Sequence, residues 1–401
     1  MESFVGELKG IPVALALAPD GRLFFTMLFG PNNGKAMVVD TGPSTVIRNP
    51  KTFFDFEAAG FPIGKTRDWG AHGIATRIEG KDLWIYMTYI HAGTTGPDGD
   101  DPARPRVIKV RDNQGIGSDP KVIIDSFPPC RLDNHCGGNI HFGPDGLMYV
   151  SVAGLSWDAE GMKWPNEIIA AQQEIKSGPR SGYGAIYRFN PDGTPASGNP
   201  FPENPGLYAY GFHNAWDFTF SPDQRWLLAS EAGEASPFNG GVDEINLVEL
   251  GKNYGWPLYS GPNKLVEGGK LFPLGLREYP WWVGPETDRH PGYSDPVLTF
   301  SAPSLTTSLP TPVGLLIYSG KKFPDWAGRL LVCENTTFTE GTGVAPYPGA
   351  VSMWDIQETK GGLAFLFRGY IPTRCSVDIE EGPDGSIYST SQEGVIYNLT
   401  N

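Results

Sequence analysis

Short apolar segments alternate with turn-forming residues along almost the whole chain. β-Branched and aromatic residues are frequent in these segments, which is typical of β-strands. The pattern predicts strands over residues 82–90, 146–152, 184–190, 225–231, 329–334 and 385–391. The one fair helical candidate is PNEIIAAQQEI, residues 165–175, which begins with a proline and has apolar residues at helical spacing. The chain is therefore predicted to be an all-β protein.

A degenerate repeat punctuates these strands. It consists of a Pro-Asp turn followed by an apolar strand, at APDGRLFFTM, GPDGLMYVSV, SPDQRWLLAS and GPDGSIYSTS, which begin at residues 18, 143, 221 and 382. Proline and Asp-Gly favour a tight turn between antiparallel strands. Such repeats are typical of β-propellers, whose blades have four antiparallel strands. We predict a single six-bladed propeller over residues 1–401, closed by pairing of residues 13–17 with 394–399, because closure removes exposed sheet edges.

Composition agrees with this fold class and argues against several partners. The 52 glycines and 37 prolines are scattered, as expected for a chain with many turns. The net charge of −14 argues against nucleic acid and anionic membranes, because both bind clustered Lys and Arg. The sequence contains no apolar run of about 18 residues, so no membrane span is predicted. Most of the Trp, Tyr and Phe rings would pack in the core, and some would stack on sugars.

The cysteines are even in number, which is compatible with two disulfides. Cys130 and Cys136 lie on either side of His135, and a bridge between them would stabilise the fold by about 2 kcal/mol and stiffen the loop. Metal ligation is the alternative, but the chain has no Cys-x-x-Cys pair. We predict the pairs Cys130–Cys136 and Cys333–Cys375.

Two sequons, at Asn335 and Asn398, fit glycosylation of a secreted protein, although each alone is a common chance match. No signal peptide is visible, and the Met-Glu-Ser start resembles a trimmed mature protein or an excised domain with an added Met. The acidic charge, the even cysteines and the sequons together predict an extracellular location.

The segment RLDNHCGGNIHFGPDGLMYVSVAG, residues 131–154, contains the strongest catalytic candidate, His135. Histidine has an unperturbed pKa near neutrality, so its imidazole can accept a proton from an alcohol. Gly137 and Gly138 follow it, and glycines allow a ligand to approach where a Cβ would clash. An ordinary loop histidine is the alternative interpretation.

Further blocks carry a resemblance to a known family. GAIYRFNPDGTPASGNPF begins at residue 184, YAYGFHNAWDFTF at 208, DEINLVELGKNYGWP at 243 and PVGLLIYSGKKFPDWAGRLLV at 312. With these blocks in this order, the chain resembles the soluble quinoprotein glucose dehydrogenase superfamily from about residue 13 onward. Its Trp-rich character and its sequons make it most similar to the fungal pyranose dehydrogenases of auxiliary activity family 12. The resemblance implies a propeller that binds pyrroloquinoline quinone (PQQ) and calcium and oxidises a sugar hemiacetal.

The resemblance also implies roles for individual residues. His135 falls at the position of the base that removes the proton from the anomeric hydroxyl. His213 and Asn214 fall where an Arg-Asn pair of the bacterial enzymes contacts the quinone. Gly233 falls where a main-chain carbonyl binds calcium, and Glu234 is at the next ligand position. Calcium would polarise the quinone as a Lewis acid.

Cations and aromatic rings complete the implied site. PQQ carries three carboxylates, and Arg374 and Arg67 are the candidates to bind them, with a surface arginine as the alternative for each. Trp281 and Trp282 lie in the aromatic segment 279–293 and would stack on the sugar, with a self-packed loop as the alternative.

The sequence departs from the family pattern at two positions. The family's lysine after the LLV strand is absent, and Asn335 or Thr336 stands near its position. The carboxylate that orients the histidine in the bacterial enzymes is also missing, since YVSVAG ends in Gly154. We therefore expect another acceptor, such as a backbone carbonyl, to hold the imidazole.

These observations predict a monomeric, extracellular dehydrogenase that needs PQQ and Ca²⁺ and oxidises L-fucose, glucosone or related pyranoses. Its electrons would pass to an external acceptor, such as a cytochrome b (haem) domain or a lytic polysaccharide monooxygenase. The haem domain and the cellulose-binding module of the fungal relatives are not visible in this chain. The alternatives are a calcium-dependent, lactonase-like hydrolase and a sugar-binding propeller without catalysis.

Overall fold

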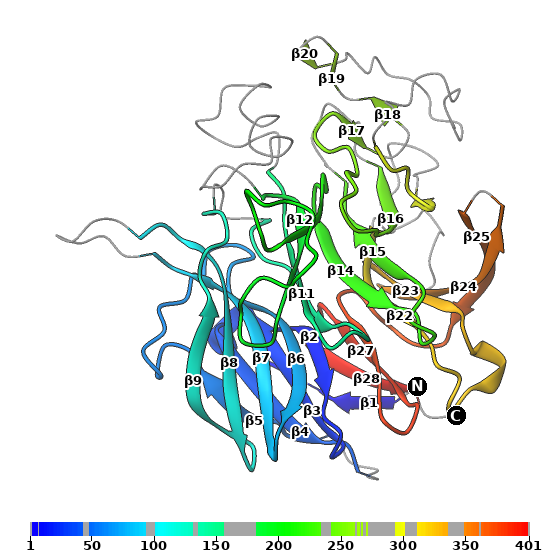
Figure 1. Cartoon of the computed structure of the whole chain (residues 1–401). Coiled ribbons are helices and arrows are strands. Elements are labelled where there is room, and N and C mark those ends of the chain that lie inside the picture. Colours follow the sequence, from blue (N-terminus) through cyan, green and yellow to red (C-terminus); the bar gives the residue numbers. More distant parts are fainter. Residues whose placement is uncertain are drawn as a thin grey trace.

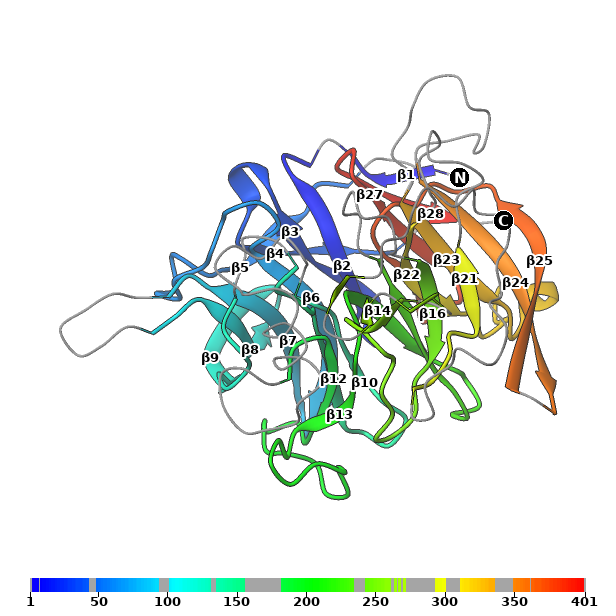
Figure 2. The same ribbon diagram turned by 90° about the horizontal axis from the view of Figure 1, so that it is seen from above.

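The computed structural model describes residues 2–6, 8–42, 48–93, 101–130, 135–155, 182–233, 242–260, 263–264, 266–267, 270–271, 293–300, 311–335, 349–360 and 362–399. Within these residues, six four-stranded antiparallel sheets are arranged around a common axis (Figures 1 and 2). The first strands of neighbouring sheets contact one another around a closed ring, from β2 through β6, β10, β14, β22 and β26 back to β2. The predicted six-bladed propeller is therefore confirmed.

The blades are numbered here along the chain, and each is given from the channel outward. The first three are β2 (Ile11–Leu17), β3 (Arg22–Leu28), β4 (Lys35–Asp40) and β5 (Lys51–Asp55); β6 (Ala71–Glu79), β7 (Asp82–His91), β8 (Arg104–Asn113) and β9 (Ile116–Ile124); and β10 (Ile140–Phe142), β11 (Met148–Val152), β12 (Ala185–Phe189) and β13 (Leu207–Tyr210). The last three are β14 (Ala215–Phe220), β15 (Leu227–Glu231), β16 (Asp243–Leu247) and β21 (Leu298–Phe300); β22 (Thr311–Ile317), β23 (Leu330–Asn335), β24 (Ala350–Thr359) and β25 (Gly362–Ile371); and β26 (Ile379–Glu381), β27 (Ile387–Ser391), β28 (Val395–Leu399) and β1 (Glu2–Val5).

The remaining described elements are short. They are two two-stranded ribbons and two 3-10 turns: β17 (Tyr259–Ser260) with β18 (Asn263–Lys264), β19 (Val266–Glu267) with β20 (Lys270–Leu271), Gly30–Asn32 and Pro324–Trp326. The helix predicted over residues 165–175 lies outside the described residues. Within the described part of the chain, no helix has the length and hydropathy that a membrane span requires.

The Pro-Asp repeat occupies the same turn in four blades, between the innermost strand and the second strand. The residue directly after the Pro-Asp pair has a left-handed φ in each case, at Gly21 (86°), Gly146 (75°), Gln224 (67°) and Gly385 (84°). Three of these positions are glycine, which tolerates this conformation best. The aspartate caps the turn, as at Asp145, which accepts the N–H of Leu147 at 3.0 Å.

The hydrophobic core is divided among the interfaces between blades. One buried cluster joins blade 1 to blade 2 and includes Phe24 and Ile85, while the cluster between blades 4 and 5 includes Ile245 and Val332. Equivalent clusters join the other neighbouring blades. Because each blade buries both faces against its neighbours, its strands read as nearly continuous apolar runs rather than as strict alternation.

The ring is closed by a different strand from the one predicted. β28 pairs with β1, in a register that places Glu2 opposite Asn398, while residues 13–17 belong to β2, the innermost strand of blade 1. The first residues of the chain therefore form the outermost strand of the last blade (Figure 2). The prediction failed because β1 is only four residues long and carries too little pattern to be recognised.

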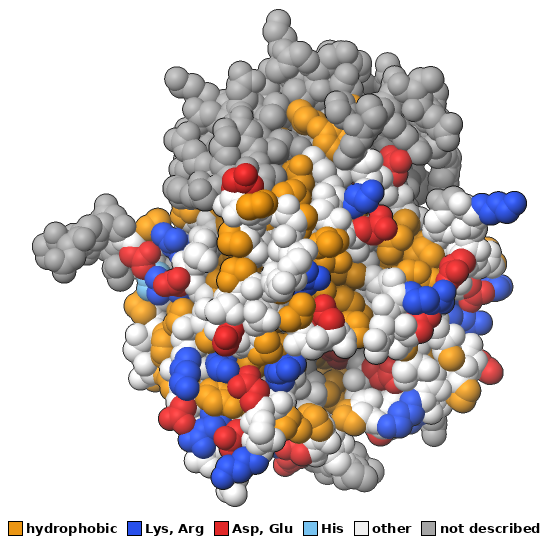
Figure 3. All heavy atoms as spheres, in the orientation of Figure 1, with side chains coloured by type: hydrophobic (Ala, Val, Ile, Leu, Met, Phe, Trp, Pro, Cys, Tyr) orange, Lys and Arg blue, Asp and Glu red, His pale blue; other side chains and the backbone are white. Residues whose placement is uncertain are grey.

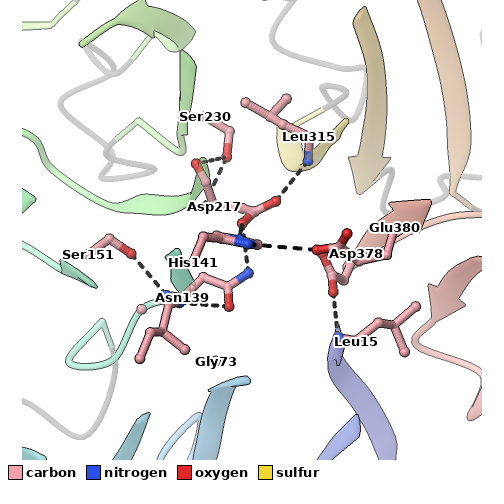
Figure 4. A network of polar contacts seen from close by, with 12 residues as sticks. Leu15, Gly73, Asn139, His141, Ser151, Asp217, Ser230, Leu315, Asp378 and Glu380 are labelled. Atoms are coloured by element: carbon pink, nitrogen blue, oxygen red, sulfur yellow. Dashed lines mark hydrogen bonds and ion pairs between the residues drawn. The ribbon is translucent and has the colours of Figure 1, made fainter. Parts of the chain in front are cut away.

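A polar network fills the middle of the channel (Figure 4). The carboxylate of Asp217, which is 1% exposed, accepts hydrogen bonds from Asn139 Nδ2 at 2.7 Å and His141 Nε2 at 2.8 Å. Its second oxygen accepts the main-chain N–H of Leu315 at 2.9 Å. One side chain of blade 4 thus binds both neighbouring blades.

Asp378 has the corresponding role between the last and first blades. Its Oδ2 accepts the main-chain N–H of Leu15 at 2.6 Å (Figure 4). Two residues later, Glu380 Oε1 lies 3.8 Å from Nδ1 of His141. Beyond this layer, a cavity of about 300 Å³ is lined by the final residues of several innermost strands, among them Leu17, Phe142 and Phe220. The network therefore separates the two ends of the channel.

Acidic and basic side chains lie next to one another over the lower part of the face in Figure 3. Several of the ion pairs link strands. Arg22 on β3 contacts Asp112 on β8 at 2.7 Å and joins blades 1 and 2, while Lys109 on β8 contacts Glu79 on β6 at 2.9 Å. The first pair therefore links two blades, and the second links two strands of the same blade.

Candidate active site

The loops at one end of the channel carry the predicted site residues. Innermost strands begin at this end, so the segments before β6, β10, β14 and β26 meet there, together with the segment after β15. These segments contain Arg67, His135, His213, Arg374 and Gly233. The polar network of the channel lies below them, and the cavity of about 300 Å³ is at the opposite end.

His135 is held in an unusual main-chain conformation. Its φ is +50°, a left-handed value that is uncommon for a residue with a side chain. The next residue, Cys136, forms a disulfide with Cys130, as predicted, with 5.4 Å between the Cα atoms. On the other side, the His135 N–H donates to Oδ2 of Asp68, on blade 2, at 2.9 Å. Strained residues persist where their surroundings hold them in place, and such residues cluster at functional sites.

Gly137 and Gly138 serve the packing of the protein itself rather than the approach of a ligand. A Cβ on Gly137 would lie 1.5 Å from Nδ1 of His72, and one on Gly138 would lie 2.2 Å from the carbonyl oxygen of Ser151. These glycines were expected to let a ligand approach. The structure corrects that expectation, because their neighbours are side-chain and main-chain atoms of blades 2 and 3.

His213 lies beside His135. The two imidazole rings are edge to face, with centroids 5.2 Å apart, and the ring of Trp256 packs on His213 at 4.5 Å. Nδ1 of His213 donates to the carbonyl oxygen of Ala232 at 2.7 Å, and its main-chain N–H donates to Glu231. His213 is 1% exposed, so its orientation is fixed by hydrogen bonds and packing together.

Burial raises the pKa of Glu231 to about 7, although the His213 N–H and the charge of His213 favour its ionised form. This carboxyl also accepts a hydrogen bond from Asn246 Nδ2 at 3.0 Å. Glu231 thus connects the DEIN segment, residues 243–246, to the histidine. A buried acid with a raised pKa next to an imidazole is a common feature of functional sites.

Gly233, the predicted calcium ligand, is anchored through its N–H. That group donates to Oδ1 of Asp243 at 2.6 Å, and Oδ2 of Asp243 accepts the Thr311 hydroxyl at 2.9 Å. Burial raises the pKa of Asp243 to about 6. Across the described residues, no three His, Cys, Asp or Glu side chains are grouped closely enough to hold a metal ion by themselves. The other predicted ligand, Glu234, lies outside the described residues.

The two predicted arginines differ in their surroundings. Arg67 is exposed and has a φ of +46°. Arg374 is partly buried, and its Nη1 donates to Glu393 at 3.0 Å. Asn214 is 6% exposed, and its carbonyl oxygen accepts the N–H of Ala232. These residues lie at the same end of the channel as His135, and the ring of His213 contacts that of His135.

The position of the missing lysine is occupied by the end of β23. Glu334 is 2% exposed there, and burial raises its pKa to about 7. It lies beside Cys333, which forms the second predicted disulfide with Cys375, with 5.2 Å between the Cα atoms. A buried carboxyl thus stands next to the position where the family has a cation.

The remaining predicted residues fall into two groups. Asn335 is the last residue of β23, and Asn398 lies within β28. Each of these sequon residues has a buried Oδ1. Trp281 and Trp282 lie outside the described residues.

Five residues that surround the two histidines and Gly233 were not predicted from the sequence, namely Asp68, His72, Glu231, Asp243 and Trp256. Asp68 and His72 stand in the TRDWGAHGIA block and Asp243 begins the DEIN block, so both motifs contained a signal whose role was not assigned. The role becomes visible only when loops from different blades are brought together.

Comparison with known proteins identifies the family of this chain. The sequence profile described as Glucose / Sorbosone dehydrogenase matches residues 10–335. The chain belongs to this family. Among curated proteins, this dehydrogenase-family chain is 28% identical over 320 residues to an uncharacterized protein of Synechocystis, which covers 77% of this chain and 64% of that protein. It is 24% identical to the aldose sugar dehydrogenase YliI of Escherichia coli, over 83% of this chain and 78% of YliI. The chain thus spans less than two thirds of the Synechocystis protein.

Solved structures show the same fold as this Glucose / Sorbosone dehydrogenase family member. An oxidoreductase of Thermus thermophilus described as a glucose dehydrogenase has a TM-score of 0.69 at 23% identity, covering 99% of both chains. The PQQ-bound form of an aldose sugar dehydrogenase from Streptomyces coelicolor has a TM-score of 0.65 at 20% identity, over 99% and 96% of the two chains. A calcium structure of the Trichoderma reesei family AA12 protein has a TM-score of 0.60 at 13% identity, over 99% and 94%. The predicted superfamily is confirmed.

Proposed function

We propose that this protein is a PQQ- and calcium-dependent dehydrogenase that oxidises pyranose sugars at the anomeric carbon. The observation that carries the proposal is the pair of fixed histidines, His135 and His213, with ring centroids 5.2 Å apart at the mouth of a family propeller. The coarser activity, that of a sugar dehydrogenase, follows from membership of the Glucose / Sorbosone dehydrogenase family.

The residues at this end of the channel fit the two groups that the proposal requires. PQQ presents carboxylates and quinone oxygens, which match the guanidinium groups of Arg67 and Arg374 and the imidazole of His213. Calcium prefers oxygen ligands, and Gly233, whose carbonyl is the proposed ligand, is held through its own N–H, which donates to Asp243 at 2.6 Å. When bound, the quinone would supply the electron acceptor for a hydride.

The chain's own task is to hold the sugar and to take up a proton. His135 is the base in this proposal, and it receives the proton of the anomeric hydroxyl at Nε2, because its Nδ1 is buried. The contact with His213, the disulfide to Cys130 and the hydrogen bond to Asp68 all restrict the position of this residue. A fixed base needs no rearrangement before proton transfer, which lowers the entropic part of the barrier.

The finer parts of the proposal concern substrate, acceptor and location. L-Fucose, glucosone and related aldoses are the proposed substrates, and Trp281 or Trp282 would stack on the sugar. The electrons would pass to an external acceptor, such as a cytochrome b domain or a lytic polysaccharide monooxygenase. Both disulfides are present, as expected for a protein that works in an oxidising compartment, and they support an extracellular location.

Dye reduction by the purified protein tests the proposal. L-Fucose and a panel of aldoses are offered while PQQ is titrated with and without Ca²⁺. The proposal requires saturable activity that depends on both additions, with the ranking of kcat/KM identifying the sugar. Activity without PQQ would refute the proposed cofactor. An absence of both activity and PQQ binding would refute the whole proposal and favour a hydrolase or a sugar-binding propeller.

A further inference from the structure

We propose that Asp68 is a positioning residue that holds His135 in its productive main-chain conformation. The inference rests on the proposed role of His135 as the base, and it assigns a function to a carboxylate on a different blade. Asp68 stands in the segment before β6, and His135 stands in the segment before β10. Their contact spans 67 positions of the sequence and crosses the interface between blades 2 and 3.

The contact acts on the main chain of His135. Oδ2 of Asp68 accepts the His135 N–H at 2.9 Å, a geometry normal for a strong N–H to carboxylate hydrogen bond. The φ of His135 is +50°, so the residue must be held against its intrinsic preference for negative φ. The direction of the Cα–Cβ bond follows from φ and ψ, and the imidazole position follows from that bond. A carboxylate that fixes the N–H therefore also fixes where the base points.

Asp68 is itself held firmly. Its carbonyl oxygen accepts a hydrogen bond from Nε2 of His72, which lies on β6 and is 4% exposed. Burial lowers the pKa of His72, which favours the neutral imidazole despite the nearby charge of Asp68. The carbonyl oxygen of His72 in turn accepts the hydroxyl of Thr26, on β3 of blade 1. The chain of contacts from Thr26 to His135 crosses three blades.

The other side of His135 is held by a disulfide and by close packing. Cys136, the residue directly after His135, forms a disulfide with Cys130. The two following glycines are packed so closely that a Cβ on Gly137 would lie 1.5 Å from Nδ1 of the same His72. His72 thus contacts both the segment that carries Asp68 and the segment that follows His135. Loss of Asp68 would release one side of His135 and leave the other in place, so the loop would remain folded while the base moved.

Two substitutions separate this role from others. In Asp68→Ala no acceptor remains, whereas in Asp68→Asn an amide oxygen of nearly the same position remains available to the N–H. Asp145→Ala is the matched control, because Asp145 also accepts a main-chain N–H, that of Leu147 at 3.0 Å, but lies at the opposite end of blade 3. The control removes a carboxylate and a turn hydrogen bond without touching the site.

Two readouts are measured on the full chain. Dye reduction with PQQ and Ca²⁺ gives kcat, KM and the PQQ dissociation constant. Amide hydrogen exchange in protein labelled with ¹⁵N-histidine gives the local result, since the six histidines yield six main-chain signals, and the signal of His135 is assigned by its loss in His135→Gln. The exchange measurement is made with and without PQQ, so it does not depend on turnover.

The expected result for Asp68→Ala is a fall in kcat of about 10- to 100-fold, because a misplaced base loses the benefit of orientation. KM and the PQQ dissociation constant should stay within about threefold, and exchange of the His135 amide should accelerate at least about tenfold as its hydrogen bond is lost. Asp68→Asn should stay within about threefold of the wild type in both readouts, and Asp145→Ala should change neither of them.

Other results overturn the proposal. A large rise in the PQQ dissociation constant with unchanged exchange would make Asp68 a cofactor contact. If kcat falls as far in Asp68→Asn as in Asp68→Ala while the His135 amide exchanges at the wild-type rate, then catalysis depends on the negative charge of Asp68 and not on its hydrogen bond to the His135 N–H. If the wild type oxidises no aldose, the proposed function fails, but the exchange rates still report whether Asp68 holds the His135 main chain.

Discussion

Replacement of Asp217 by asparagine should weaken the hydrogen-bond network of the channel. The size of the loss shows how much the negative charge of Asp217 contributes to stability. Asp217 accepts three hydrogen bonds, from Asn139, His141 and Leu315, and is almost fully buried. An asparagine in this place carries no charge and has one acceptor oxygen in place of two. At least one donor would then face an NH₂ group, and His141 would lose its counter-ion.

The magnitude follows from the environment of His141. Burial alone would lower the pKa of this imidazole, but its hydrogen bond to Asp217 and the charges of Asp217 and Glu380 raise the pKa from 6.5 to about 9. A rise of that size corresponds to about 3 kcal/mol. Because the side chain of His141 retains 20% exposure, we expect a loss of about 2 to 3 kcal/mol in the free energy of unfolding of Asp217→Asn.

The pH dependence of this loss has a defined sign. His141 has a higher pKa in the folded than in the unfolded protein, so its contribution is complete below pH 6.5 and disappears as the pH rises through about 9. Burial also raises the pKa of Glu380, to about 7, so the stability of the wild type should fall further between pH 4.5 and 7. The difference between wild type and Asp217→Asn should therefore be largest at pH 6 and shrink towards pH 9.5.

Urea unfolding followed by tryptophan fluorescence, at several pH values between 5.5 and 9.5, gives these free energies. Asp223→Asn is the matched control, because Asp223 pairs with Arg225 in an exposed turn and its removal should leave stability nearly unchanged at every pH. A loss smaller than about 1 kcal/mol at pH 6, or one that does not vary with pH, would show that the His141–Asp217 pair does not carry the assigned stability.

Three further predictions concern the site and its support. His135→Ala should lower turnover by about 10²- to 10⁴-fold while PQQ binding, measured by its spectral change, is retained. Asp243→Ala should weaken calcium binding by about tenfold or more in an activity titration, because the Gly233 N–H loses the carboxylate that accepts it and the residue is no longer held in place. Replacing both Cys333 and Cys375 by serine opens a loop with a sequence separation of 42 residues and should lower the free energy of unfolding by about 4 kcal/mol, measured in urea.

Each of these has a result that contradicts it. Unchanged sugar oxidation by His135→Ala would show that His135 is not the base. Wild-type calcium affinity in Asp243→Ala would show that the hydrogen bond from the Gly233 N–H to Asp243 does not matter for calcium binding. A variant without the Cys333–Cys375 bridge that is as stable as the parent would mean that this bridge adds nothing to the stability of blades 5 and 6.

Features encoded by neighbouring residues could be predicted from the sequence. The Pro-Asp turns were recognised because proline, Asp-Gly and the following apolar strand are contiguous, and the structure gives these turns the left-handed φ that glycine tolerates. The two disulfides were also predicted correctly. His135 and His213 were found as family positions, and the structure brings their rings together.

Features that depend on how blades meet could not be predicted. The contact between Asp68 and His135 joins loops of two blades, and nothing in either loop alone identifies its partner. The polar channel network has the same origin, because Asp217 and Leu315 meet only once blades 4 and 5 are packed. The closing strand was assigned wrongly because the four residues of β1 have no distinguishing pattern.

The pairing of β1 with β28 has a consequence for synthesis of the chain on the ribosome. Glu2 is synthesised long before its partner, Asn398. At roughly 5 to 20 residues per second, translation separates the two by about 20 to 80 s. During that interval β1 has no strand to pair with, and the earlier blades form an open arc whose first and last blades each have one face without a neighbouring blade. The ring can close only once β28 has been synthesised, so these apolar faces stay uncovered until then.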